Sequence, residues 1–294
     1  MSTTGTADLF RSVRRLELVA RRNAAGRLQG DYVTSFKGSG LLFEEPRRYV
    51  AGDPVRSIDW NITARVGEPH VRVHHEERQR EVLLVLDVSP SMHVGFKRRT
   101  KLEMAVELAA TLAVSAIGAG DRLGHLTFAD RVLDSSRPRS GRSQLWRVLR
   151  ALVEQTAPWS RPVALSDPRT AIHQLETRRR GRQVIFLISD FLDRDVPDDL
   201  RYLRPRHDVS LIHVYDPFEL ARREHLSLPA RSPEGRGRPD FLPRADGTGL
   251  GALRNRLALA CARLGITSVS TSTAEPVKAA LSQLFRRKRR LRAA

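Results

Sequence analysis

The stretch that decides the fold is residues 82–92, Val-Leu-Leu-Val-Leu-Asp-Val-Ser-Pro-Ser-Met, where five apolar residues lead into Asp87, Ser89 and Ser91. A continuous Val/Leu run of this length predicts a strand buried on both faces, as in a parallel sheet covered by helices. Open sheets of this kind bind ligands beyond the carboxyl ends of their strands. The three oxygen-bearing side chains are therefore expected at the ligand-binding edge of a sheet.

A second apolar run, residues 183–189, also ends in a carboxylate, Asp190, and Thr170 opens a helical stretch shortly before it. Carboxylate and hydroxyl oxygens are hard donors that suit Mg²⁺, Mn²⁺ or Ca²⁺. The sequence thus predicts that two strand-end carboxylates and three hydroxyls meet at one cation. A plainer alternative is that Asp87 and the serines only cap the following helix, because Ser and Asp favour strand-to-helix turns.

Strands and helices alternate along the rest of the chain, which predicts a doubly wound, mostly parallel α/β sheet. Residues 217–248, rich in Pro, Gly and Arg, are expected to form a loop or short hairpin. Helices are expected at 100–118, 144–155, 168–178, 195–203, 250–264 and 276–287, and strands at 123–128, 184–189, 209–215 and 266–271.

The first 81 residues have a different pattern. Residues 7–27 predict an amphipathic helix that ends at Gly26 and Gly30. Residues 57–66 and 70–76 resemble strands joined at Gly67-Glu68-Pro69, which predicts a β-hairpin. The expected organisation is an N-terminal helix and β-rich subdomain (1–81), an α/β domain (82–285) and a basic tail (286–294).

The Asp87, Ser89, Ser91 spacing, D-x-S-x-S, resembles the metal-ion-dependent adhesion site (MIDAS) of von Willebrand factor type A domains. The resemblance implies that Ser89 and Ser91 ligate the cation directly. It implies that Asp87 and Asp190 act through hydrogen bonds or water. The implied cofactor is Mg²⁺ or Mn²⁺, and an acidic residue of a partner completes its coordination shell. Binding of the cation only together with that partner is one of the two expected cases, the other being binding without it.

The same resemblance implies a threonine ligand from a variable loop. Thr170 is the expected residue, and Thr156 and Ser166 are nearby alternatives. Lys97 and Arg98 precede the next helix and are expected near the cation, where they compete with it, bind an acidic partner or are simply solvated.

Residues 47–65, RRYVAGDPVRSIDWNITAR, resemble the signature of the bacterial family called domain of unknown function 58. The resemblance extends over residues 8–220 and implies a von Willebrand type A-like segment after the signature. It also implies a partner, a MoxR-type AAA+ ATPase, in systems with a chaperone-like role in maturing other proteins. The signature residues are Arg48, Tyr49, Gly52, Asp53, Arg56, Asp59, Trp60 and Arg65. We interpret four of them, Arg48, Arg56, Asp59 and Arg65, as an ion-pair cluster around Trp60 that fixes the hairpin to the α/β core. The alternative is a substrate-binding role for this cluster.

The amino-acid composition bears on the kind of partner that the protein binds. The chain of 294 residues has 51 Lys and Arg against 33 Asp and Glu, a net charge of +18. Nucleic acid is not an expected partner, because aromatic residues make up only 6% of the chain and no RNP or zinc-finger pattern occurs. The basic excess is interpreted mainly as a solvated face. The alternative is that the basic residues form a positively charged surface that attracts an acidic partner or, through the tail, makes a weak contact with an anionic membrane.

The single cysteine, Cys261, excludes an internal disulfide and a cysteine metal cluster. No stretch is long and apolar enough to suggest a signal peptide or a transmembrane segment, so a cytoplasmic location is expected.

The function expected from these features is a non-enzymatic protein-binding module with a MIDAS-type site. One alternative is a Mg-dependent hydrolase with Asp87 as phosphoaspartate nucleophile. It is disfavoured because Ser89 stands where that chemistry needs a second aspartate. The other is a peripheral membrane-associated scaffold.

Overall fold

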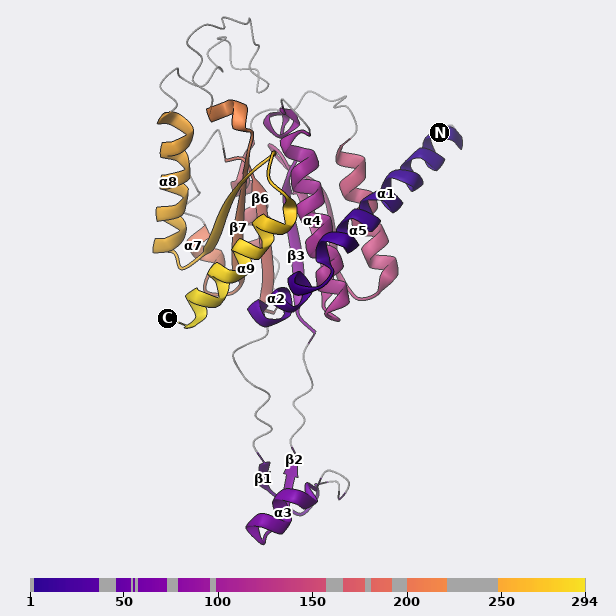
Figure 1. Ribbon diagram of the computed structural model, residues 1–294, viewed down its shortest axis with the longest axis vertical. Helices are drawn as coiled ribbons and strands as arrows, with labels where there is room; N and C mark the ends of the chain where they lie inside the picture. The colour runs from indigo at the N-terminus through magenta and orange to yellow at the C-terminus, as the bar shows by residue number, and fades with distance from the viewer. Residues whose placement is uncertain are drawn as a thin grey trace, which may run out of the picture. The chain divides into compact units, whose positions relative to one another are not determined.

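The computed structural model describes residues 3–36, 46–53, 55, 58–72, 79–95, 99–156, 166–177, 181–191, 200–220 and 248–293. They fall into two compact units (Figure 1). The main unit comprises Met1–Ser35 and Arg80–Ala294, and the small unit comprises Phe36–Gln79.

The main unit contains a six-stranded sheet in the order β5-β4-β3-β6-β7-β8. Strands β4, β3, β6, β7 and β8 are parallel, and β5 pairs antiparallel with β4 at one edge. This arrangement confirms the predicted doubly wound, mostly parallel α/β fold. The strands are β3 (Glu81–Asp87), β4 (Arg122–Phe128), β5 (Val132–Arg139), β6 (Gln183–Ser189), β7 (Asp208–Tyr215) and β8 (Thr267–Ser272).

Helices cover both faces of the sheet (Figure 1). The first face is covered by α4 (Lys101–Gly118), α5 (Arg142–Gln155) and α9 (Val277–Ala293), and α1 (Thr3–Ala24) packs across α4 and α5. The second face is covered by α6 (Pro168–Thr177), α7 (Leu200–Leu203) and α8 (Thr248–Arg263). Leu83 and Val85 pack toward this second face, and every residue from Val82 to Leu86 is fully buried. Strand β3 is thus covered on both sides, as its apolar run predicts.

Strand β5 was not predicted, because its sequence, VLDSSRPR, has little of the apolar character of a strand. Its pairing with β4 is irregular, with register shifts between Leu123 and His125 and between Thr127 and Phe128. Gly124 lies in the first of these. A Cβ atom there would lie 2.7 Å from the carbonyl oxygen of Ser136 and 2.9 Å from the nitrogen of Pro138, so the two backbones can approach only at a glycine.

In the small unit, β1 (Pro46–Arg48) pairs antiparallel with β2 (His70–Arg72). Residues predicted to form a strand instead form helix α3 (Trp60–Val66). Asp59 caps this helix by accepting hydrogen bonds from the nitrogens of Asn61 and Ile62, and Gly67 ends it with a φ of 79°. The hairpin prediction was therefore wrong, because a capped start and a glycine stop outweigh the strand-like residues between them. Residues 73–76 of the predicted second strand lie outside the described residues.

The predicted ion-pair cluster around Trp60 is also corrected. Trp60 is 67% exposed and is no buried anchor. Arg47 instead binds Asp53 through two hydrogen bonds of 2.7 and 2.6 Å, and Arg48 lies 2.9 Å from Glu68. Arg56 lies outside the described residues.

The N-terminal helix belongs to the main unit and not with the small one. Helix α1 ends at Ala24, and Gly26, with a φ of 72°, lies in the turn that follows, as predicted. The chain then continues as a second helix, α2 (Arg27–Phe36), and Gly30 lies inside it and ends no helix. The Tyr32 hydroxyl donates to Asp121 at 2.9 Å, and the Ser35 hydroxyl donates to the Phe285 carbonyl at 3.1 Å. These buried contacts place the boundaries near residues 35 and 80. Besides the boundary near residue 80, which lies close to the expected one after residue 81, the chain has a second boundary near residue 35 that was not predicted.

The expected basic tail is the end of helix α9, which continues to Ala293. Lys288 is only 4% exposed and donates to Asp208, which also accepts from Arg292 at 2.8 Å. Arg289 lies 2.8 Å from Asp31 of α2. Much of the terminal positive charge is therefore paired within the protein.

Deleting residues 288–294 is expected to lower the free energy of unfolding by about 3 kcal/mol, because Asp208 loses both of its cationic partners. Urea denaturation of the shortened and full-length chains measures this. Equal stabilities would mean that these residues behave as a solvated tail.

Candidate metal centre at the ends of strands β3 and β6

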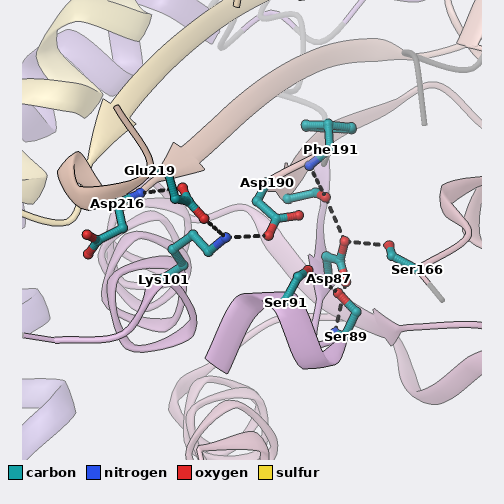
Figure 2. A network of polar contacts seen from close by, with 10 residues as sticks. Asp87, Ser89, Ser91, Lys101, Ser166, Asp190, Phe191, Asp216 and Glu219 are labelled. Carbon is teal, nitrogen blue, oxygen red and sulfur yellow. Dashed lines mark hydrogen bonds and ion pairs between the residues drawn. The ribbon is translucent and has the colours of Figure 1, made fainter. Parts of the chain in front are cut away.

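The candidate site lies where the topology places a ligand. From β3 the chain crosses to β4 on one side, whereas β6 lies on the other side of β3, so β3 and β6 flank the switch point of the sheet. Asp87 ends β3, Ser189 ends β6, and Asp190 follows directly after it. Figure 2 shows the side chains of Asp87 and Asp190 converging with those of Ser89 and Ser91 from the loop after β3.

Asp87 is the centre of a buried hydrogen-bond network. Its Oδ1 accepts from the Ser89 nitrogen at 2.9 Å. Its Oδ2 accepts from the hydroxyls of Ser166 at 2.7 Å and Ser189 at 2.6 Å. Burial, and next the Asp190 carboxylate, raise the pKa of Asp87 to about 6, although these three hydrogen bonds oppose the rise. A cation beside Asp87 would stabilise its charged form.

The two serines after β3 face one another. Pro90 begins a single turn, η2 (Pro90–His93), which follows directly on Ser89. This turn brings the Ser91 Oγ to 3.1 Å from the Ser89 Oγ. Adjacent ligands of an octahedral Mg²⁺ ion, each about 2.1 Å from the metal, are separated by about 3 Å. The two hydroxyls are therefore spaced as neighbouring ligands of one such ion.

Asp190 is held at a sharp backbone turn. The next residue, Phe191, has a φ of 49°, which is rare for a residue with a large side chain. Its backbone nitrogen donates to the Ser189 hydroxyl at 3.0 Å. The same serine therefore binds Asp87 and fixes the turn that carries Asp190.

A buried lysine, Lys101, completes the network. Its Nζ donates to Asp190 Oδ2 at 2.7 Å and to Glu219 Oε1 at 2.5 Å, and its side chain is 0% exposed (Figure 2). Burial lowers the pKa of Lys101, but the carboxylates of Asp190 and Glu219 outweigh it and raise the pKa above its ordinary value. Lys101 is therefore an internal cation beside the candidate metal position.

Sequence reasoning missed Lys101. It is the first residue of α4, whose N-cap Thr100 and Glu103 form a reciprocal capping box. A positive side chain is unfavourable at a helix N-terminus unless it has an acidic partner. A lysine that opens a largely apolar helix is the signal that could have found it.

The network extends to the ends of β7 and β8. Glu219 Oε2 accepts from the Asp216 nitrogen at 2.8 Å. Asp216 in turn accepts from the Phe218 nitrogen at 2.9 Å and from the Thr273 hydroxyl at 2.7 Å. The polar groups at the ends of four parallel strands are thus linked through Lys101.

The structure brings together most of the predicted site residues. From the segment before β6, however, the hydroxyl that reaches the site is that of Ser166 and not that of Thr170. Ser166 contacts Asp87, whereas the Thr170 hydroxyl donates to the carbonyl of Asp167 at 2.8 Å. Thr156, the other alternative, donates to the Val153 carbonyl at 2.7 Å. Lys97 and Arg98 lie outside the described residues.

The donor chemistry fits a cation site built mainly on hydroxyls. Among the described residues, no group of three or more His, Cys, Asp or Glu side chains is placed to hold a metal ion. Ser89 and Ser91 supply neutral hard oxygens at ligand spacing, and Asp87 lies directly behind them. Asp190 shares its charge with Lys101, so it fits an outer position better than a direct one.

His213 lies on β7 beside this network, with its Nδ1 3.1 Å from the Ser270 hydroxyl. Burial lowers the pKa of His213 from 6.5 to about 4; the Asp190 carboxylate opposes this shift, and the cations Lys101 and Arg254 add to it. The unfolded chain therefore binds a proton at a higher pH than the folded protein does.

This difference predicts that His213 contributes about 3 kcal/mol of stability above pH 6.5, which is lost as the pH falls from 6.5 to 4. Urea denaturation across this range should show a smaller loss of stability in His213→Gln than in the wild type. Parallel pH profiles would contradict the assignment.

The fold and the network together define a class: a doubly wound α/β protein with an oxygen-rich centre at the switch point of its sheet. The family model described as "Protein of unknown function DUF58" matches residues 45–226. The uncharacterized protein Rv1480 of Mycobacterium tuberculosis is 35% identical over 213 residues, 72% of this chain and 67% of the relative. The chain therefore belongs to the DUF58 family, as residues 47–65 predict.

Two solved structures show similarity at low sequence identity. An aerotolerance-related membrane protein from Bacteroides fragilis has a TM-score of 0.46 and 18% identity, over 72% of this chain and 99% of its own. A von Willebrand factor type A protein from Catenulispora acidiphila has a TM-score of 0.37 and 13% identity, over 71% of this chain and 41% of its own. The first is described as a membrane protein, and the expected cytoplasmic location is withdrawn. Within the described residues, no helix is long and apolar enough to cross a membrane.

Proposed function

We propose that this protein is a binding module that uses a divalent cation, Mg²⁺ or Mn²⁺, to engage an acidic residue of a partner protein. The observation that carries the proposal is the pair of facing hydroxyls, Ser89 and Ser91, 3.1 Å apart and directly in front of Asp87. Ser89 and Ser91 would ligate the cation directly. Asp87, Asp190 and a hydroxyl of Ser166 or Thr170 would support it from behind.

Charge explains why a partner's carboxylate would complete such a site. The two serine ligands are neutral, and the negative charge of Asp190 is already shared with the ammonium of Lys101. The cation's charge would therefore be only partly neutralised by the protein itself. An incoming Asp or Glu supplies both the missing oxygen ligand and the remaining negative charge.

The environment of Asp87 supports binding over catalysis. A phosphoaspartate nucleophile needs a carboxylate oxygen that can reach a substrate. Asp87 is 0% exposed, and both of its oxygens accept short hydrogen bonds from protein groups. These contacts hold the carboxylate in place as a support for the neighbouring serines.

The partner that we propose is a MoxR-type AAA+ ATPase, on the family resemblance, in a chaperone-like role in maturing or assembling other proteins. Pull-down of such an ATPase by the immobilised protein tests this, with Mg²⁺ or with EDTA. Binding should need Mg²⁺ and should be lost in Ser89→Ala. The control is Ser12→Ala, an exposed serine of α1. Capture that withstands both EDTA and Ser89→Ala would refute the cation bridge.

A further inference from the structure

A polar cavity lies in the main unit, and none of its lining residues belongs to the candidate metal centre. It is lined by strand β5, the facing part of β4 and helix α5, and has a volume of about 430 Å³. Four arginines line it: Arg137 and Arg139 from β5, and Arg147 and Arg150 from α5. Cavities of this size accommodate small ligands.

The cavity has a buried, hydrogen-bonded histidine in its wall. His125 is 2% exposed, with Nε2 2.9 Å from Asp134 Oδ2 and Nδ1 2.8 Å from the Ser136 hydroxyl. A carboxylate can only accept, so Nε2 carries a proton. The Gln144 amide also donates to the Ser136 oxygen, at 3.3 Å. Ser136 is thus held by hydrogen bonds to His125 and Gln144, and these contacts fix the side chains that form the cavity wall.

The charges in the cavity do not balance. Arg150 is paired with Glu154 at 2.8 Å, and Asp134 accepts from His125. Within the described part of the chain, no hydrogen bond or ion pair is found for the side chains of Arg137, Arg139 and Arg147. Four guanidinium groups against two carboxylates leave two positive charges when His125 is neutral.

We propose that this cavity binds the phosphate group of a small soluble ligand. Guanidinium groups match phosphate oxygens with paired, charge-assisted hydrogen bonds. The excess of two positive charges equals the charge of a phosphate monoester dianion. The arginines come from two different elements, so a tetrahedral anion between them can be contacted from both sides.

Calorimetric titration in EDTA, which keeps cations from the metal centre, tests this with inorganic phosphate, pyrophosphate and AMP. Adenosine and succinate serve as comparators without phosphate. At least one phosphate compound should bind saturably with one site. Arg147→Gln and Arg137→Gln should each weaken binding on the order of tenfold, the cost of one charged hydrogen bond. Arg290→Gln, which alters an exposed arginine of α9, should leave it unchanged.

Several results would overturn the proposal. One is the absence of saturable binding at millimolar concentrations. A second is equal weakening by Arg290→Gln, which would indicate general attraction to a basic protein. A third is succinate binding as tightly as phosphate. Flotation with phosphatidic acid vesicles distinguishes a lipid source. Arg147-dependent flotation without binding of soluble phosphates would assign the phosphate to a lipid headgroup and refute the soluble ligand.

Discussion

Replacing Lys101 by methionine is expected to lower the free energy of unfolding by about 3–5 kcal/mol, because it leaves the buried Asp190 carboxylate and the partly buried Glu219 carboxylate without their cation. The Lys101 ammonium lies 2.7 Å from Asp190 and 2.5 Å from Glu219 and is shielded from water. Methionine retains the length and apolar volume of the side chain, so the effect reports on charge. Urea denaturation in EDTA measures it.

Two comparisons sharpen this test. Lys278→Met alters an exposed lysine of α9 and should change stability by less than about 0.5 kcal/mol. Adding Mg²⁺ should stabilise Lys101→Met more than the wild type. In the variant, no ammonium group neutralises the Asp190 carboxylate, so a nearby cation has more negative charge to compensate. A Lys101→Met protein as stable as the wild type in EDTA would show that the ion pairs do not hold the network together.

Asp87→Asn is expected to weaken Mg²⁺ binding about 10–100-fold, the usual effect of removing a group that orients metal ligands. Asp87 accepts from the Ser89 nitrogen and from the hydroxyls of Ser166 and Ser189. An asparagine NH₂ cannot accept those two hydroxyl bonds, and the negative charge behind the serines is lost.

Calorimetric titration of Mg²⁺ measures this effect. Asp8→Asn, at an exposed aspartate of α1, is the matched control and should bind as the wild type does. Circular dichroism spectra of all three proteins should coincide. Unaltered affinity in a folded Asp87→Asn protein would mean that Asp87 only caps the turn after β3.

The part of the fold that positions the site could be predicted from sequence because buried parallel strands are locally distinctive. The run ending at Asp87 and the run ending at Asp190 are apolar throughout, and both form central strands. Parallel strands place their carboxyl ends at one edge, so the meeting of the two carboxylates follows from the strand pattern.

The rest of the site depends on long-range contacts that leave little local signal. Lys101 reaches Glu219, 118 residues later, and Ser166 reaches Asp87, 79 residues earlier. A lysine beside a loop is ordinarily solvated, and nothing near Ser166 distinguishes it from Thr170 before folding. Such partners are chosen by the packing of α4 and α6 on the sheet.

Some of the wrong predictions outside the site also arise from long-range contacts. The end of α9 was expected to be a free tail because six basic residues lie close together, yet Asp208 and Asp31 pair with three of them. Strand β5 was overlooked because an edge strand need not be apolar. In α3, by contrast, a local signal was present, the cap at Asp59, and the strand-like residues after it were given more weight.

The most direct test of the central claim is calorimetric titration of Mg²⁺ and Mn²⁺ into the wild type and into the double variant Ser89→Ala/Ser91→Ala. The variant removes both proposed ligands and leaves Asp87 with its hydrogen bond from the backbone of residue 89. We expect the wild type to bind one ion saturably and the folded variant to bind none. Equal binding by both proteins, or none by the wild type at millimolar concentrations, would contradict it.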